Sequence, residues 1–338
     1  MATFALPTGL SITRWASEFV TEFVRENPYF KYMGKGERNV INVNKDLAKQ
    51  NGERLRIPYA KKLGGTVVTG STALLGNETA FETAVDEVVL TLRRKAVIFG
   101  EDQTYKTDLD LLSAAKSSLV EHASKSIGLD IGTALGSVIV AGGAGLPDTA
   151  VAFGSASGGQ KTAFDTANED RIYDTEEGEG FTAAVLRGAK SMARRTATGS
   201  SFAITPLKSD AGNSIDTYVV FAGLTRFEEF AADAEVKAAN QNARPRDVES
   251  NPLFTGGDLY LDGVIVHLDP SLPDDEAYLC GQNAVLLGWG KETSMIKDVT
   301  DYGHNTGIGY KEIRGMKKAS VGGVQVGVVT IRFTAVTP

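Results

Sequence analysis

Apolar residues near the start of the sequence recur at the spacing of an α-helix. Trp15, Phe19 and Phe23 follow one another at steps of four residues, which places them on one face of the helix. Asn27-Pro28 ends the pattern, because the residue before a proline avoids helical backbone angles. No nearby element can cover this stripe, so we predict that it packs on the body of its own subunit or on a neighbouring subunit.

Residues 53–99 show the two-residue alternation of β-strands at both ends, over Leu55–Tyr59 and over Val88–Leu92. Between these strands lie about 25 residues of low hydrophobicity, and a loop of that length is seldom idle in a compact domain. The segment begins with Lys61, Lys62, Leu63, Gly64 and Gly65 and continues as a Thr/Ser/Gly-rich stretch. The pattern predicts a protruding β-hairpin arm.

The pattern changes to a helical period from Thr107 onward. Asp108 and Asp110 would lie in the first turn, where negative charge suits the helix dipole. An apolar stripe then extends to Val138, and Gly142-Gly143 ends it. A helix of about 30 residues would be roughly 45 Å long, which exceeds the radius of one small domain.

The second half of the chain mixes short helices and strands. The expected elements are a loop over 141–180, a helix over Phe181–Arg195, strands over Phe202–Pro206 and Tyr218–Ala222, a helix over Arg226–Asn240, a hairpin over Leu259–Val266 with Asp262-Gly263 at its turn, and a closing strand over Val321–Val336. Because no regular βαβ alternation occurs, the predicted fold class is α+β.

Composition and charge exclude several classes of protein. The chain of 338 residues has 35 basic and 42 acidic side chains, a net charge of −7, which does not support bulk attraction to nucleic acid or to an anionic membrane. Cys280 is the single cysteine, so an internal disulfide and a thiolate zinc site are excluded. The longest uncharged run, Ile131–Leu146, is too short to span a bilayer, and no secretory signal is evident. We therefore expect a soluble protein made in a reducing cytosol.

The segment Gly154–Thr162 is the nearest approach to a nucleotide-binding motif. A P-loop needs the spacing G-x-x-x-x-G-K-[ST], so that backbone N–H groups and the lysine meet one phosphate chain. Here Gln160 separates Gly159 from Lys161 and displaces the lysine by one residue. A flexible surface loop is the better interpretation, and nucleotide hydrolysis at this segment is kept as a minor alternative.

Other candidate chemistry is weak. His122, His267 and His304 lie too far apart for a local metal motif, and Cys280 is expected to be a small buried thiol. The acidic runs Asp274–Glu276 and Glu176–Glu179 suggest solvated loops. We predict no catalytic residue, no cofactor site and no metal site.

Three basic clusters leave two interpretations open. They are Arg93–Lys95, Arg194–Arg195 and Lys317–Lys318. Together with the acidic runs they fit a charge-complementary surface for self-association, and they fit scattered solvated charge equally well.

The order of the predicted elements, with two later segments, carries a resemblance to a known family. The segments are Asn251–Gly257 (NPLFTGG) and Leu259–His267 (LYLDGVIVH), followed more weakly by Ala284–Gly290 and Asp301–Gly303. The chain resembles tailed-phage major capsid proteins of the HK-ninety-seven (Johnson) fold, and it is most similar to the major capsid family of the N-four-like podophages.

The resemblance implies a division of the chain. It would consist of an N-terminal arm (1–50), an extended loop (51–100), a peripheral domain with the spine helix (101–195), an axial domain (196–304) and a return to the peripheral domain (305–338). Some members crosslink a loop lysine to an asparagine. Lys61 and Lys62 are the candidate donors by location alone, and we favour a shell without crosslinks.

The implied function is a non-enzymatic major capsid protein that assembles into pentamers and hexamers of an icosahedral head around double-stranded DNA. Partners would be other copies of the chain, a separate scaffolding protein, a portal, possible decoration proteins and DNA bound without sequence specificity, with no membrane. The expected location is the virion capsid after assembly in the host bacterial cytoplasm. The inter-subunit contacts would involve Trp15, Phe19, Phe23, Lys61, Lys62, Leu63, Gly64 and Gly65. The alternative within the same fold is an encapsulin-type nanocompartment shell.

Overall fold

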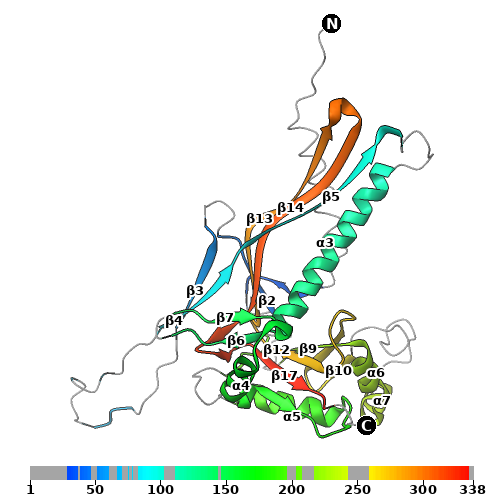
Figure 1. The fold of residues 1–338 in the computed structure, drawn as a ribbon. Coiled ribbons are helices and arrows are strands. Elements are labelled where there is room, and N and C mark those ends of the chain that lie inside the picture. Colours follow the sequence, from blue (N-terminus) through cyan, green and yellow to red (C-terminus); the bar gives the residue numbers. More distant parts are fainter. Residues whose placement is uncertain are drawn as a thin grey trace.

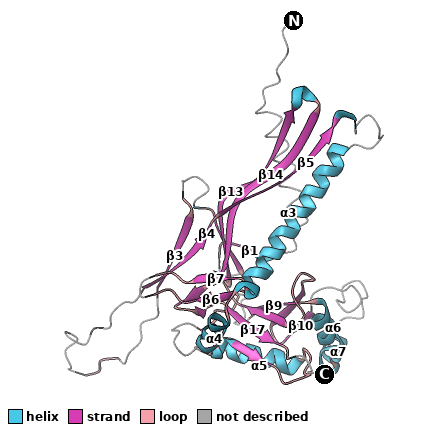
Figure 2. Ribbon diagram, in the orientation of Figure 1, coloured by secondary structure: helices cyan, strands magenta, loops and turns pink. Residues whose placement is uncertain are grey.

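A long helix and two long strands lie side by side in the upper part of Figure 1, and a compact part with several short helices lies below them. This computed structural model describes residues 29–36, 39–46, 52–60, 67–70, 75, 78, 83–102, 111–143, 146–195, 203–207, 217–242 and 259–334. Figure 2 shows the same elements by type, with strands extending through both parts and most of the short helices gathered in the lower one.

The upper part is built on an antiparallel pair of unusual length. β13 (Val285–Thr300) pairs with β14 (Asn305–Lys318), and β5 (Thr91–Gly100) pairs with the other edge of β14. β2 (Ile41–Asn44) and β1 (Met33–Gly34) complete a five-stranded sheet in the order β1-β2-β13-β14-β5. The sequence pattern did not predict β13 and β14, because several buried positions carry glycine in both strands, and charged residues such as Glu312 and Arg314 in β14, where apolar residues are expected.

The spine helix α3 (Leu111–Leu135) packs along this sheet. Its buried positions Leu119, Ala123 and Ile127 share a core with Ile308 and Tyr310 of β14. The 25 residues give a length of about 37 Å. The predicted continuation to Gly142 is wrong: the β-branched residues after Gly136 form β6 (Val138–Val140), which pairs with β7 (Thr149–Val151).

The lower part contains a six-stranded sheet in the order β10-β11-β9-β12-β17-β8. Its strands are β8 (Ile172–Asp174), β9 (Tyr218–Ala222), β10 (Leu259–Leu261), β11 (Val264–Leu268), β12 (Glu276–Cys280) and β17 (Val328–Arg332). Both faces of the sheet are buried: Phe221 joins the core that includes α3, whereas Val220 joins the core beneath α5 (Ala183–Arg194) and α6 (Leu224–Ala232).

Several predicted elements of this part are confirmed. The strand over Tyr218–Ala222 has the predicted bounds, and α5 begins two residues after the predicted start, where Thr182 caps it. The Asp-Gly hairpin is also present. Asp262 and Gly263 have φ values of 50° and 80°, the left-handed conformation that a two-residue turn requires.

Other predictions here are wrong. The segment 141–180 is not a loop, because it contains β7, η3 (Phe153–Ser155), α4 (Gly158–Ala167), η4 (Glu169–Arg171) and β8. The helix over Arg226–Asn240 is two helices, since α6 ends at Ala232 and α7 (Ala234–Asn242) follows after Asp233.

The two remaining predicted strands also differ. The part of Phe202–Pro206 that the structure describes forms no strand, and Leu207 makes only an isolated bridge to Thr217. The closing strand is interrupted: β15 (Ser320–Val321) and β16 (Val324–Gln325) form a tight hairpin before β17, because Gly322 and Gly323 adopt positive φ.

The extended hairpin consists of β3 (Arg54–Ala60) and β4 (Thr83–Val89), and among the described strands each pairs only with the other. It projects to one side of the molecule (Figure 1). The predicted alternation is confirmed on β3, where Leu55 is buried between exposed neighbours. The other short elements are η1 (Phe30–Tyr32) and η5 (Asp301–Gly303).

Candidate functional site: the buried root of the extended hairpin

The residues that the sequence singled out for contacts between subunits cannot be placed. Trp15, Phe19, Phe23, Lys61, Lys62, Leu63, Gly64 and Gly65 all lie outside the described residues. The described structure directs attention instead to the place where the extended hairpin joins the body.

The hairpin is seated on the body by one apolar face. Leu55 and Val88 face each other across β3 and β4, and they pack with Leu286 of β13 and with Ala319. The fit is close, because a Cβ added at Gly315 of β14 would lie 2.0 Å from the carbonyl oxygen of Val89. Only glycine therefore allows β4 to cross β14 at this distance.

A buried ion pair lies on the same face. Asp86 is two residues before Val88, is fully buried, and forms an ion pair with the ammonium group of Lys317, which is 4% exposed. The Asp86 carboxylate also accepts hydrogen bonds from the backbone N–H groups of Ser320 (3.1 Å) and Glu87 (2.9 Å). Burial raises the pKa of Asp86, and the charge of Lys317 opposes that shift.

The pair also connects to the turns beside it. Lys317 donates to the backbone carbonyl of Asp148. The Asp148 carboxylate accepts from the backbone N–H groups of Gly142 (3.1 Å) and Gly323 (2.9 Å). The β6–β7 hairpin, the β15–β16 turn and β4 are thus tied to one ammonium group. We call Asp86, Lys317, Asp148 and Ser320, with the apolar residues beneath them, the hairpin root.

The outer face of the hairpin carries a second set of charges. Glu87 is nearly buried beneath Arg54 and Arg56, and its carboxylate accepts one hydrogen bond of 2.9 Å from each guanidinium. The hydrogen bond from Arg56 is the main cause that lowers the pKa of Glu87. Both arginines are largely exposed, so these bonds add little stability but keep β3 and β4 in register.

A further buried cluster joins β14 to the spine helix. Arg314 is 1% exposed and contacts Glu312 and Asp130, each at 2.6 Å, and it also reaches Ser126 of α3. Arg93 of β5 binds the same Asp130 carboxylate, and Thr293 donates to Glu312. These charges therefore tie α3 to the neighbouring strands.

Lys318 is buried on the opposite face of β14 from Lys317. Its ammonium group donates to the carbonyl oxygen of Leu135 at the end of α3 (2.9 Å) and lies over the ring of Phe164. Burial lowers the pKa of Lys318 to about 7. The expectation that Lys317–Lys318 lies on a charged surface is wrong, because strand β14 is covered on both faces at its C-terminal end. The sequence around Lys317 and Lys318 contains no pattern from which the burial of these two side chains could have been predicted.

The other candidate residues occupy structural positions. Cys280 is a buried thiol, as predicted. His122 binds the hydroxyl of Tyr310 (3.0 Å), and His267 packs against aromatic rings. Among the described residues no group of three or more His, Cys, Asp and Glu side chains could hold a metal ion. Within the same part of the chain no helix is long and apolar enough to cross a membrane.

The acidic run Asp274–Glu276 is only partly solvated. Asp274 is exposed but accepts hydrogen bonds from the backbone N–H and the hydroxyl of Thr225, in the first turn of α6. Glu276 binds Arg332 and accepts from the hydroxyl of Tyr278. Glu176 and Glu177 are exposed, as predicted.

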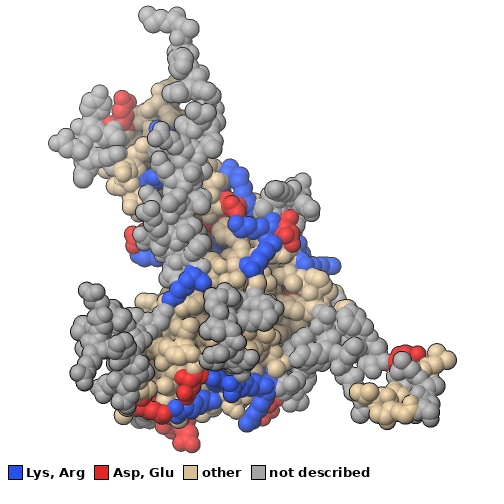
Figure 3. Space-filling model, turned by 180° about the vertical axis from the view of Figure 1, so that it is seen from behind, with Lys and Arg blue, Asp and Glu red and all other residues tan. Residues whose placement is uncertain are grey.

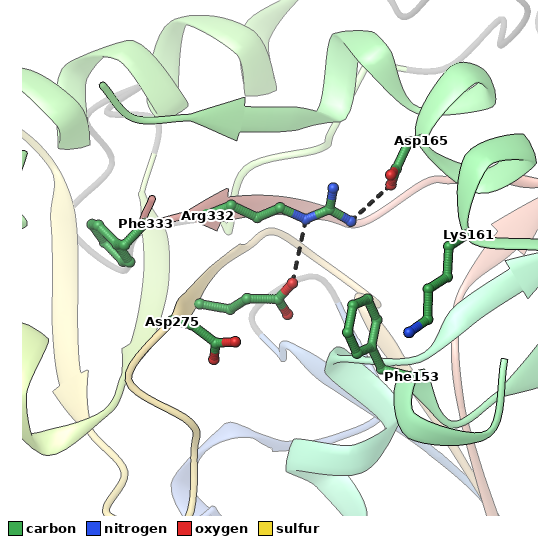
Figure 4. Close-up of a pocket in the computed structure, with 7 residues that line it drawn as sticks. Phe153, Lys161, Asp165, Asp275, Arg332 and Phe333 are labelled. Carbon is green, nitrogen blue, oxygen red and sulfur yellow. Dashed lines mark hydrogen bonds and ion pairs between the residues drawn. The ribbon is translucent and has the colours of Figure 1, made fainter. Parts of the chain in front are cut away.

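The segment Gly154–Thr162 begins a helix. Ser157 caps α4 by accepting a hydrogen bond from the backbone N–H of Gln160, and the Gln160 side-chain oxygen accepts one from the backbone N–H of Ser157. These two backbone N–H groups, which a bound phosphate would need, are therefore already used by the cap. Lys161 lies 3.9 Å from the ring centroid of Phe153 (Figure 4). The adjoining cavity of about 210 Å³ is lined by three carboxylates, and its Arg332 is already paired with Asp165 and Glu276. This arrangement disfavours a nucleotide phosphate.

Charge on the visible surface is mixed. Figure 3 shows Lys and Arg side chains interspersed with Asp and Glu on the face seen from behind. No single-sign field dominates that face, which agrees with the modest net charge of −7.

The described structure thus defines an elongated subunit in which a network of buried polar contacts, the hairpin root, holds the extended hairpin against the body. The sequence matches the phage capsid protein family over residues 3–274, and the chain belongs to that family. The family and the matched structures support its function as a phage major capsid protein, and a structural rather than enzymatic role is expected of such a protein.

Solved capsid structures show the same fold. The chain is 32% identical to the cyanophage Pam1 capsid asymmetric unit, with all of both chains covered and a TM-score of 0.82. The capsid of Ralstonia phage GP4 matches at 20% identity, with 93% of each chain covered and a TM-score of 0.70. The capsid of Helicobacter pylori bacteriophage KHP30 matches at 16% identity, with 91% covered and a TM-score of 0.69. No curated protein matches the sequence.

Proposed function

We propose that copies of this chain assemble into the pentamers and hexamers of an icosahedral phage head that encloses double-stranded DNA. The observation that carries the proposal is the similarity to the Pam1 capsid asymmetric unit over the full length of both chains. The order of extended hairpin, spine helix and two sheets further supports an HK-ninety-seven-like fold. Affiliation with the N-four-like podophage family, and the division of the chain at residues 50, 100, 195 and 304, stay predictions.

The hairpin root supplies a mechanism for this assembly. A hairpin that pairs with no other described strand must be aimed by its base if it is to reach a neighbouring subunit in a reproducible direction. The ion pair between Asp86 and Lys317 fixes the direction of the hairpin, because the attraction between two buried charges offsets their loss of hydration only when the two groups are well placed. The apolar seat around Leu55 and Val88 adds contact area without fixing direction. The hairpin thus leaves the body at a defined angle.

The remaining partners belong to the same proposal. The capsid location follows from the family, and assembly would take place in the host bacterial cytoplasm with a separate scaffolding protein, a portal and possible decoration proteins. The interspersed charges support contact with packaged DNA that is weak and independent of sequence, because no basic surface dominates the face in Figure 3.

Electron microscopy and sedimentation of the full chain test the proposal. The chain would be expressed alone and together with the scaffolding protein of its own phage. We expect capsomers and closed shells in at least one of these conditions. A folded monomer that forms neither under any of them would overturn the proposal.

A further inference from the structure

The C-terminal end of the spine helix lies where the long upper part of the molecule meets the lower part (Figure 1). Leu135 is the last residue of α3, and the chain continues through Gly136 into β6. Strand β12 of the six-stranded sheet contacts this end directly, because a Cβ added at Gly136 would lie 2.8 Å from the hydroxyl oxygen of Tyr278. Residue 136 therefore has no room for a side chain unless Tyr278 moves.

Lys318 makes the second contact at this place. It is the last residue of β14, and its ammonium group donates to the carbonyl oxygen of Leu135 (2.9 Å). The last carbonyl groups of a helix have no partner within the helix, and a positive charge suits the negative end of the helix dipole. The bond thus connects α3 to β14. We call Leu135, Gly136, Tyr278 and Lys318 the spine joint.

No counter-charge lies beside the ammonium group of Lys318. Among the described residues no carboxylate comes within ion-pair distance of it, although the neighbouring Lys317 is paired with Asp86. Glu276 on β12 and Arg332 on β17 act on Lys318 with opposite signs, and these two side chains are bound to each other. Lys318 therefore brings its charge into the interior without a partner of opposite sign in the described part of the chain.

The other groups around the ammonium nitrogen are weak partners. Cys280 of β12 is a thiol whose pKa is raised by burial, so it carries no charge. Helix α4 presents the ring of Phe164, whose centroid lies 5.0 Å from the nitrogen. Of the three N–H donors of the ammonium, only the one bonded to Leu135 is used within the described residues. Burial therefore favours the neutral amine and lowers the pKa of Lys318 to about 7.

We propose that the spine joint is a proton-sensitive clamp, which is closed while the Lys318 amine is neutral and opens when the amine takes up a proton. The neutral amine keeps its bond to Leu135, whereas the charged group is stabilised only where it reaches water. Opening would separate the end of α3 from β14 and loosen the connection between the upper and lower parts. The inference concerns a single subunit and goes beyond the proposed function, because it does not require a shell.

The direction and size of the effect follow from the two proton affinities of Lys318. Its pKa is about 7 in the closed joint and would return to the ordinary 10.5 in the open one. Because opening takes up a proton between these values, its equilibrium constant should increase about thirtyfold from pH 8.5 to pH 5.5, mostly above pH 6.5. His122, also on α3, has its pKa lowered by burial, so it takes up its proton below that interval.

Hydrogen exchange, followed by mass spectrometry on the full chain before assembly, tests the inference. The amides of residues 131–136 report on the joint, and those of β9 report on unfolding of the whole subunit. After correction for the intrinsic pH dependence of exchange, the opening constant of residues 131–136 should increase by the stated factor as the pH falls. The β9 amides should stay better protected at every pH, because their exchange requires global unfolding.

Lys318→Met isolates the proposed group. Methionine keeps a straight apolar side chain but takes up no proton, so the opening constant of residues 131–136 should lose its increase above pH 6.5. Lys291→Met, at an exposed position of β13, is the matched control and should keep the wild-type profile. Equal pH profiles of the wild type and Lys318→Met would overturn the inference. So would equal opening constants of residues 131–136 and β9 in the wild type, because the joint would then not open by itself.

A measurement on the wild type decides the question if Lys318→Met does not fold. In nuclear magnetic resonance spectra of the chain with isotope-labelled lysine, one side-chain signal should titrate near pH 7. The remaining lysine signals should titrate near the ordinary value of about 10.4. Spectra in which every lysine titrates near that ordinary value would contradict the inference. None of these measurements involves shells, so a failure here is distinct from a failure of the proposed function.

Discussion

Lys317 and Lys318 are adjacent in β14, yet their ammonium groups meet different partners. Successive side chains of a strand point to opposite faces, so Lys317 reaches Asp86 beneath the hairpin and Lys318 reaches the end of α3. Lys317 is paired with a carboxylate, whereas Lys318 donates to a carbonyl oxygen and has its pKa lowered. The two lysines therefore differ in how they respond to mutation and to pH.

Lys317→Met should lower the free energy of unfolding by about 3–5 kcal/mol, because it leaves the Asp86 carboxylate buried without its counter-charge. Urea denaturation of the unassembled subunit measures the change. Lys291→Met, at an exposed position of β13, is the control and should be near neutral. Adding Asp86→Leu to Lys317→Met should recover part of the loss. A double variant as unstable as the sum of the single variants would show that the two charges do not act as a pair.

Stability should depend on pH through Lys318. Its folded-state pKa of about 7 lies below the ordinary value of 10.5. Between these values the unfolded chain holds a proton that the folded chain lacks, so the contribution of this group to the free energy of unfolding increases with pH by up to about 1.4 kcal/mol per unit. Below pH 7 the contribution is constant and most unfavourable. Lys318→Met should remove it, so its stability relative to wild type should be greatest near pH 6 and decline towards pH 10. A constant difference over that range would contradict the assignment.

At the scale of elements, β4 can cross β14 at this distance because residue 315 is a glycine and has no side chain. The Val89 carbonyl lies where the Cβ of any other residue at position 315 would be. Apolar packing around Leu286 then holds the hairpin against the sheet. A strand pair that bonds to no third strand in the described part of the chain thereby gains a fixed place on the body.

Gly315→Ala should separate β4 from β14 and lower the free energy of unfolding by about 1–3 kcal/mol, as overpacking does. Limited proteolysis should cut the hairpin strands faster than in the wild type, because local opening precedes global unfolding. Gly154→Ala is the matched control, since a Cβ there meets nothing within 4 Å and its φ is not positive. Equal behaviour of both variants would mean that the crossing tolerates a wider separation.

At the scale of the whole molecule, two projections extend from one body. The extended hairpin leaves at the root, and the β13–β14 pair extends with α3 away from the six-stranded sheet (Figure 1). The core beneath α5 and α6 contains no residue of α3, β13 or β14, whereas the core on the other face of the six-stranded sheet includes residues of all three. Contacts with neighbouring subunits would stabilise such a subunit further, because they bind only the folded chain.

Replacement of residues 67–78 by a short Gly-Ser linker should separate folding from assembly. The subunit should keep its melting temperature within a few degrees, because closing a flexible loop costs little and the hairpin root is intact. Closed shells should be lost, which electron microscopy would show. Wild-type shells from this variant would mean that the outer hairpin makes no essential contact.

Much of the architecture was predictable where a pattern is local. The β9 strand, the Asp262-Gly263 turn and the start of α5 follow from apolar runs, turn chemistry and a threonine cap, all of which act within a few residues. The buried thiol of Cys280 was predicted for a different reason, because a free cysteine is usually a small buried residue. The family resemblance, carried by the order of these elements, extended the prediction to the function.

The tertiary structure alone decided the site. Asp86 and Lys317 are 231 residues apart in sequence, and each resembles a solvated surface charge until β4 and β14 cross. The long strands β13 and β14 were missed because glycines such as Gly315 replace the expected apolar residues where another strand passes close by. Local patterns record the preferences of one segment, whereas burial of a charge depends on which distant segment covers it, and only the folded chain determines that.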